Sequence, residues 1–135
     1  MKSKEILLND ADKKMICDWI LQIMKRKGKQ VYMTLLYNSR EHGDSVNTFH
    51  SKCNGKGYTL TLVRTTKGYL CGGFTTSNWS SCNNYRNDKN AFLFSLYFKE
   101  YYLSNDENND IYDNSSYGPT FGSGHDLYIV NGFQI

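Results

Sequence analysis

Histidines with carboxylates near them are the first residues in this sequence that could support acid–base chemistry. His125 is followed directly by Asp126, and a carboxylate beside an imidazole can fix its tautomer and orientation. Neighbouring residues on a strand point to opposite faces of a sheet, however, so a direct His125–Asp126 pair is not expected. His50 is expected on the side of a short helix opposite Phe49, where a single histidine is typical of a surface or supporting hydrogen-bonding group. The pattern favours structural or recognition roles over catalysis.

Cysteines are the possible nucleophiles, and the chain has four of them: Cys17, Cys53, Cys71 and Cys82. They form no Cys-x-x-Cys pair, and no His-x-x-x-His partner accompanies them, which argues against a zinc site. In a reducing compartment we expect free thiols rather than disulfides.

A small cysteine–histidine hydrolase or thiol enzyme is the alternative class of function for this chain. It would need Cys53 or Cys71 beside His50 or His125, and no nucleophile motif surrounds these residues. Cys53 has a lysine directly before it and another three residues after it, so it is the first candidate for a reactive thiol. Most of the thiols are expected to be buried, and buried thiols without a cationic neighbour react slowly.

Motifs that bind metals, nucleotides or other cofactors are not apparent. The carboxylates between residues 106 and 113 do not have the spacing of a calcium-binding EF-hand. The glycines between residues 118 and 124 are not followed by Gly-Lys-Ser/Thr and do not open a helix, which argues against a phosphate-binding loop. We therefore expect no metal, no cofactor and no catalytic constellation.

A glycine-rich loop containing the only proline runs into a strand between residues 115 and 129. Gly118, Gly122 and Gly124 suit positive φ angles or close backbone approaches, and Pro119 fixes a turn beside them. The segment is predicted to be a rigid surface loop, and such loops often carry function. Its candidate recognition or structural residues are Tyr117, Gly118, Pro119, Phe121, Gly122, His125 and Asp126.

The first part of the chain has the apolar spacing of helices. Residues of one predicted helical stripe recur three and four apart: Ile16, Trp19, Ile20, Ile23 and Met24. Asn9 or Asp10 is expected to cap this helix, and Gly28 to stop it. A second, short helix is expected after Asp44 or Ser45, carrying Phe49 and Cys53 on its core side.

Strands are predicted for most of the remaining apolar segments. Residue alternation indicates strands at 31–37, 58–65, 69–76 and 91–98, with short strands at 111–112 and 127–129, and a hairpin turn at Gly68. The strand at 91–98 should be central, with Phe92, Phe94, Leu96 and Phe98 on one face. Residues 38–44, 77–90 and 105–110 are predicted connections, and Trp79 in the second of these should fold back onto the core.

Two adjacent glycines interrupt the predicted strand at 69–76. Gly72 and Gly73 indicate either a bulge or a place where another group presses close to the backbone. An aromatic ring from the loop at 115–129 would fit there, and Tyr117 and Phe121 are the candidates.

Composition indicates one folded domain of the β-rich α+β class. The chain has 135 residues, 39% hydrophobic and 15% aromatic, with eleven tyrosines and seven phenylalanines. Its net charge of +3 is small, and its last third is acidic, which argues against nucleic-acid binding. No apolar run is long enough to span a bilayer, and the polar start does not resemble a signal peptide, so we expect a cytoplasmic protein.

Several sequence blocks, in order and covering most of the chain from about residue 6 to 130, resemble the TLDc domain (TBC, LysM-associated domain). The blocks are Phe49-His50-Ser51-Lys52-Cys53, Gly55-Lys56-Gly57, Thr59-Leu60-Thr61-Leu62, Gly68-Tyr69, Gly72-Gly73-Phe74-Thr75, Trp79, Ala91-Phe92-Leu93-Phe94-Ser95-Leu96, Ser115-Ser116-Tyr117-Gly118-Pro119-Thr120-Phe121-Gly122 and His125-Asp126-Leu127. The resemblance implies two antiparallel sheets packed as a sandwich with short flanking helices.

The resemblance also implies a non-enzymatic, protein-binding and regulatory role. Members of the family protect cells against oxidative stress, and several bind the vacuolar proton-pumping ATPase and regulate its assembly. No catalytic residues are carried over from the family. TLDc domains usually continue beyond the His-Asp-Leu strand, so the resemblance implies a single domain over residues 1–135 that is incomplete at its C-terminal end, either truncated or without the family's final strand.

Overall fold

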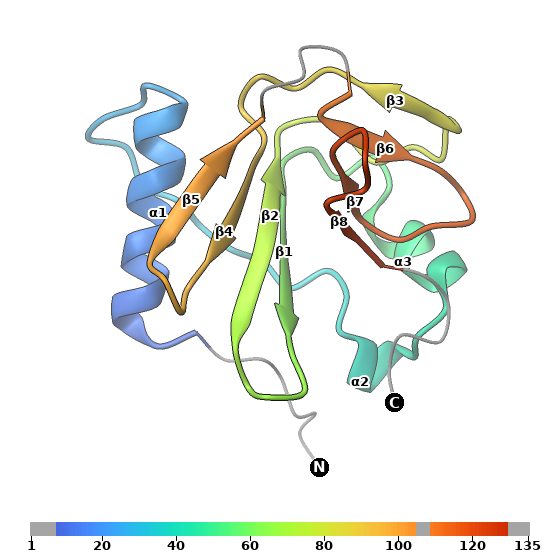
Figure 1. Ribbon diagram of the computed structural model, residues 1–135, viewed down its shortest axis with the longest axis horizontal. Helices are drawn as coiled ribbons and strands as arrows, with labels where there is room; N and C mark the ends of the chain where they lie inside the picture. The colour runs from blue at the N-terminus through green and yellow to red at the C-terminus, as the bar shows by residue number, and fades with distance from the viewer. Residues whose placement is uncertain (1–7, 105–108, 130–135) are drawn as a thin grey trace.

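The computed structural model describes residues 8–104 and 109–129. Within them the chain forms the elements α1 (Asp10–Ile23), α2 (Ser39–His42), α3 (Val46–Cys53), β1 (Thr59–Arg64), β2 (Leu70–Thr75), β3 (Asn84–Arg86), β4 (Phe92–Ser95), β5 (Glu100–Leu103), β6 (Ile111–Asp113), β7 (Thr120–Phe121) and β8 (Leu127–Tyr128). The strands make two antiparallel sheets, ordered β1-β2-β4-β5 and β3-β6-β7-β8. Helix α1 covers one face of the first sheet, and the second sheet and α3 lie on its other side (Figure 1). The predicted β-rich α+β class with two sheets is confirmed.

Helix α1 packs on the first sheet through the predicted stripe. Ile16 and Ile20 are buried in a cluster with Phe74, Phe92, Phe94 and Leu96 of that sheet. The Trp19 ring lies 6.3 Å from the ring of Phe94 and 5.4 Å from that of Tyr101, so it contacts the sheet as expected.

The ends of α1 agree only in part with the predicted caps. The Asn9 side chain accepts a hydrogen bond from the Asp12 N–H at 2.7 Å, as an N-cap should. The predicted stop at Gly28 is wrong, because the helix ends at Ile23 and Lys25 already has a φ of 55°. The left-handed residue that ends the helix is therefore a lysine rather than a glycine.

Residues 31–37 do not form the strand that their composition predicted. Val31 packs against the core of the first sheet, whereas Leu36 and Tyr37 pack against the core between the second sheet and α3. The segment therefore runs from one core to the other, and among the described residues it has no pairing partner in either sheet. β-propensity without a pairing partner does not make a strand.

Strand β4 is central in the first sheet, as predicted, but it is shorter than the predicted segment. Phe92, Phe94 and Leu96 are buried on the helix side, whereas Phe98 lies in the turn before β5 and is exposed. The prediction that Phe98 shares the buried face is therefore wrong. Three strands were not predicted: β3, which lies inside the expected loop at 77–90, β5, which is largely exposed, and β7, which lies inside the glycine-rich loop.

The glycine pair in β2 lies where neighbouring groups leave no room for a side chain. A Cβ atom on Gly72 would stand 1.8 Å from the Thr61 carbonyl oxygen, and one on Gly73 would stand 2.7 Å from the ring of Phe121. Gly73 faces the second sheet, so the ring of Phe121 in β7 rests directly on the backbone of β2. The predicted close approach is confirmed, and Phe121 rather than Tyr117 fills the space.

Substituting Gly73 with alanine should weaken the joint between the sheets. Phe121 is buried and cannot move aside without disturbing Trp79, so the added methyl group should lower the free energy of unfolding by roughly 1–3 kcal/mol. Urea denaturation would measure the loss. Gly124→Ala is the matched control, because a Cβ atom there would only reach 3.8 Å from Asp126, and we expect a change within about 0.5 kcal/mol. Equal losses in both variants would contradict the close-contact explanation.

Candidate functional site on the second sheet

Five aromatic side chains gather on the second sheet and are called here the tyrosine–histidine cluster: Tyr85, Tyr112, Tyr117, His125 and Tyr128. Tyr85 and Tyr112 are register partners across the β3–β6 pair, with ring centroids 4.6 Å apart. The His125 ring stacks on Tyr112 at 5.1 Å and lies 5.5 Å from Tyr117 and 5.7 Å from Tyr128. Every member is at least partly exposed, and Tyr128 is 52% exposed. The cluster is therefore an accessible surface made of rings that hold one another in place.

His125 lies in the turn between β7 and β8, not on the strand. Its N–H donates to the Gly122 carbonyl at 3.1 Å, and its backbone is left-handed with a φ of 54°. Its Nε2 atom is 3.2 Å from the Tyr85 hydroxyl, which also donates to the Ser123 carbonyl at 3.2 Å. The ring is thus positioned by the turn and by Tyr85.

Among the hydrogen bonds of the described residues, none joins the side chains of His125 and Asp126. A direct pair was not expected on the ground of strand geometry, but His125 lies in a turn, where that geometry does not apply. The Asp126 carboxylate is exposed and folds over Gly122, where a Cβ atom would stand 2.2 Å from a carboxylate oxygen. Gly122 also has a φ of 86°, so a side chain there would be both strained and obstructed.

His50 is buried, which corrects the expectation of a position opposite the core side of its helix. Its Nε2 atom faces two carbonyl oxygens, those of Asn114 at 2.9 Å and Tyr117 at 2.7 Å, and its Nδ1 atom is 2.8 Å from Asn54 Oδ1. Carbonyl oxygens only accept hydrogen bonds, so Nε2 carries a proton. His50 therefore fastens the loop that carries Tyr117 to helix α3.

The loop after Tyr117 is held by the strand segment that follows it. The Gly118 N–H donates to the Ile129 carbonyl at 2.6 Å, and the Ile129 N–H donates to the Pro119 carbonyl at 3.2 Å. Gly118 and Pro119 are buried, and a Cβ atom on Gly118 would stand 3.2 Å from Ile129. This pairing places Tyr117 next to Tyr128 on the surface, with ring centroids 6.2 Å apart.

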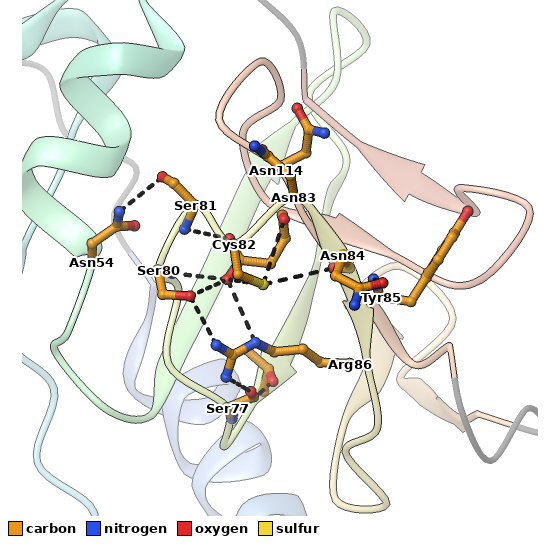
Figure 2. A network of polar contacts seen from close by, with 12 residues as sticks. Asn54, Ser77, Ser80, Ser81, Cys82, Asn83, Asn84, Tyr85, Arg86 and Asn114 are labelled. Carbon is orange, nitrogen blue, oxygen red and sulfur yellow. Dashed lines mark hydrogen bonds and ion pairs between the residues drawn. The ribbon is translucent and has the colours of Figure 1, made fainter.

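A fully buried carboxylate, Asp113 at the end of β6, organises the chain between Trp79 and β3. It accepts hydrogen bonds from the Ser80 N–H at 2.8 Å, the Ser80 hydroxyl at 2.9 Å and the Ser81 N–H at 2.9 Å, and it lies 3.6 Å from Arg86 Nε. Figure 2 shows Arg86 reaching Ser80 and Ser77, and Ser81 facing Asn54 of the turn after α3. The network joins α3, the loop and two strands beneath the aromatic cluster.

The described cysteines and histidines do not form a catalytic pair. In the hydrogen bonds of residues 8–104 and 109–129, no thiol contacts a histidine ring. Cys53 is buried, and burial raises the pKa of its thiol to about 11 despite the partly opposing effect of Lys52 and Lys56. Cys82, by contrast, is exposed. No group of three or more metal-ligating side chains is present among the described residues.

Three members of the cluster were not singled out from the sequence: Tyr85, Tyr112 and Tyr128. The chain has many tyrosines, and which of them share a face depends on the pairing of β3 with β6, which are far apart in the sequence. Asp113 was also missed, because the carboxylates between residues 106 and 113 were weighed only as calcium ligands. The one available sign was that Asp113 directly follows the predicted strand at 111–112.

The two sheets and the short helices agree with the architecture that the resemblance to the TLDc domain implied. The family model of the TLDc domain matches residues 1–135, so the chain belongs to the TLDc domain family. TLDc domains are generally non-catalytic modules. In the described residues no helix is long and apolar enough to cross a membrane.

Particular relatives resemble parts of this chain. MTOR-associated protein MEAK7 of Danio rerio is 32% identical over 71 residues, which is 53% of this chain and 16% of the relative. TBC1 domain family member 24 of Xenopus tropicalis is 46% identical over 46 residues, which is 34% of this chain and 8% of the relative. The matched part thus covers only a small fraction of each of these larger proteins.

Replacing Asp113 with asparagine should destabilise the fold. The amide would present N–H groups to backbone N–H donors and leave Arg86 without its carboxylate, so we expect a loss of about 2–4 kcal/mol in the free energy of unfolding. Urea denaturation measures this. Asp126→Asn is the control, because that carboxylate is exposed, and a loss there as large as at Asp113 would contradict the role given to the buried network.

Alkylation of the native protein should modify Cys82 before Cys53. A thiol pKa of about 11 in place of 9.0 leaves about a hundredfold less thiolate near neutral pH, and burial adds a steric barrier. Mass spectrometry after a short iodoacetamide pulse would locate the label, and labelling in urea should remove the difference. Faster native labelling of Cys53 would show that helix α3 opens or that the thiol is activated.

Proposed function

We propose that this chain is a non-enzymatic TLDc-type binding and regulatory module and that the tyrosine–histidine cluster is its recognition surface. The observation that carries the proposal is the set of partly exposed rings around His125, held by mutual packing and by the buried groups beneath them. Tyrosine is enriched at protein interfaces because it offers a large contact area, a hydroxyl group and little conformational entropy to lose. A rigid surface of this kind suits a protein partner.

The residues divide into two groups in this proposal. Tyr117, His125 and Asp126 contact the partner, together with Tyr85, Tyr112 and Tyr128. The remaining candidate residues are structural. His50, Gly73, Gly118, Pro119, Phe121 and Gly122 support that surface from below, whereas Gly72 gives strand β2 room beside Thr61 and Phe94 on the helix side of the first sheet. This assignment follows their burial and their contacts, since these supporting residues are buried apart from the partly covered Gly122.

The partner class comes from the family. We propose a cytoplasmic role in resistance to oxidative stress, exerted through subunits of the vacuolar proton-pumping ATPase. The alternative, a cysteine–histidine hydrolase or thiol enzyme, has less support, because Cys53 is buried with a raised pKa and no thiol among the described residues contacts a histidine.

Binding of the purified chain to the purified peripheral sector of the vacuolar ATPase would test the proposal. Tyr128→Ala and His125→Asn should each weaken binding about tenfold or more, as removal of a central aromatic contact does in other interfaces. Asparagine is chosen at position 125 because it tolerates the left-handed backbone.

Tyr58→Ala is the matched control, because Tyr58 is 54% exposed just before β1 and packs on Phe74 of the other sheet, compared with 52% exposure for Tyr128. Weakening by the control equal to that of Tyr128→Ala would reject the cluster as the recognition surface. Absence of binding by the unmodified chain, with unchanged peroxide sensitivity in cells that lack the protein, would reject the proposed partner and role.

A further inference from the structure

A second group of exposed aromatic side chains lies on the first sheet, away from the tyrosine–histidine cluster. Tyr69 follows the turn between β1 and β2, and Tyr97 and Phe98 form the turn between β4 and β5. Their rings are in contact, with centroids 4.6 Å apart for Tyr69 and Tyr97 and 5.0 Å for Tyr97 and Phe98. They are nevertheless 47%, 61% and 66% exposed. We call these three residues the aromatic tip.

The aromatic tip occupies one end of the sheet. The two turns that carry it point in the same direction, at the lower end of the first sheet in Figure 1. The Leu96 N–H donates to the Leu70 carbonyl at 3.0 Å, which ties the turns together. The three rings therefore project together from the ends of two adjacent turns, where a flat surface could meet all of them at once.

Cations flank the aromatic tip. Arg64, Lys67 and Lys99 are exposed in or beside the two turns, and none forms an ion pair with another described residue. Glu100 is the only acid in these turns, and its carboxylate accepts a hydrogen bond from the Tyr102 hydroxyl at 2.9 Å. The two turns therefore carry an excess of positive charge beside exposed rings.

From this combination we propose that the aromatic tip binds the surface of an anionic phospholipid bilayer. Tyrosine and phenylalanine rings favour the boundary between headgroups and acyl chains, and lysine and arginine beside them attract anionic headgroups. The charge complementarity selects an anionic bilayer. The domain would rest on the membrane with the first sheet end-on, and the tyrosine–histidine cluster on the second sheet would stay outside the contact.

Vesicle co-sedimentation of the full chain would test this. The chain should bind vesicles of phosphatidylcholine mixed with phosphatidylserine, bind much less to phosphatidylcholine alone, and dissociate as salt is raised. Lys67→Glu with Lys99→Glu should weaken binding about tenfold or more, and Tyr97→Ser with Phe98→Ser should do the same.

The control variant combines Lys29→Glu with Tyr32→Ser, which makes the same types of change at exposed positions outside the two turns. It should bind like the unmodified chain, and circular dichroism should show every variant folded. Equal binding to vesicles with and without phosphatidylserine would overturn the proposal. An equal loss of vesicle binding in the control variant would do so as well. So would self-association in the absence of lipid that the Tyr97→Ser, Phe98→Ser variant abolishes, because the tip would then be an interface between copies of the chain.

Discussion

The two sheets meet where the Phe121 ring rests on the backbone of Gly73. This contact joins the two sheets at a point where neither could move without opening a gap, because Phe121 also lies 6.1 Å from Trp79 and is 3% exposed. Trp79 in turn donates to the Thr59 hydroxyl at 2.9 Å, so the same packing reaches strand β1. A glycine at position 73 lets the ring approach the strand at van der Waals distance, which makes the interior between the sheets dense.

The second sheet relies on buried polar groups more than on apolar area. Its strands are only two or three residues long, so few side chains can be buried along them. Asp113 and His50 make up for this by binding backbone groups of the intervening loops. The buried carboxylate of Asp88 acts in the same way on the residue that follows β2. It accepts hydrogen bonds from the Thr76 N–H at 2.6 Å and from the Thr76 hydroxyl at 2.7 Å. Hydrogen bonds to a charged acceptor are stronger than neutral ones, and they fix geometry, so the surface above is held rigidly.

Local patterns predicted much of the fold. The stripe on α1, the N-cap at Asn9, the hairpin at Gly68 and the central position of β4 all depend on residues close together in the sequence, and all are found in the structure. Residues 31–37 and Phe98 were mispredicted because their composition suits a strand but pairing and burial are supplied by distant residues. The TLDc family was recognisable because its blocks keep their order along the chain.

In the candidate site too, features set by neighbouring residues were predictable, whereas features set by distant residues were not. The sequence predicted that a loop rich in glycine and containing the proline carries Tyr117, His125 and Asp126, and that the glycine pair marks either a bulge or a close approach, because both follow from the local backbone preferences of glycine and proline. The gathering of Tyr85, Tyr112 and Tyr128 around His125 follows from long-range strand pairing, as do the burial of His50 beneath the loop and the enclosure of Asp113. These relations depend on which distant strands pair, and the free energy that selects the pairing comes from the whole core rather than from any one segment.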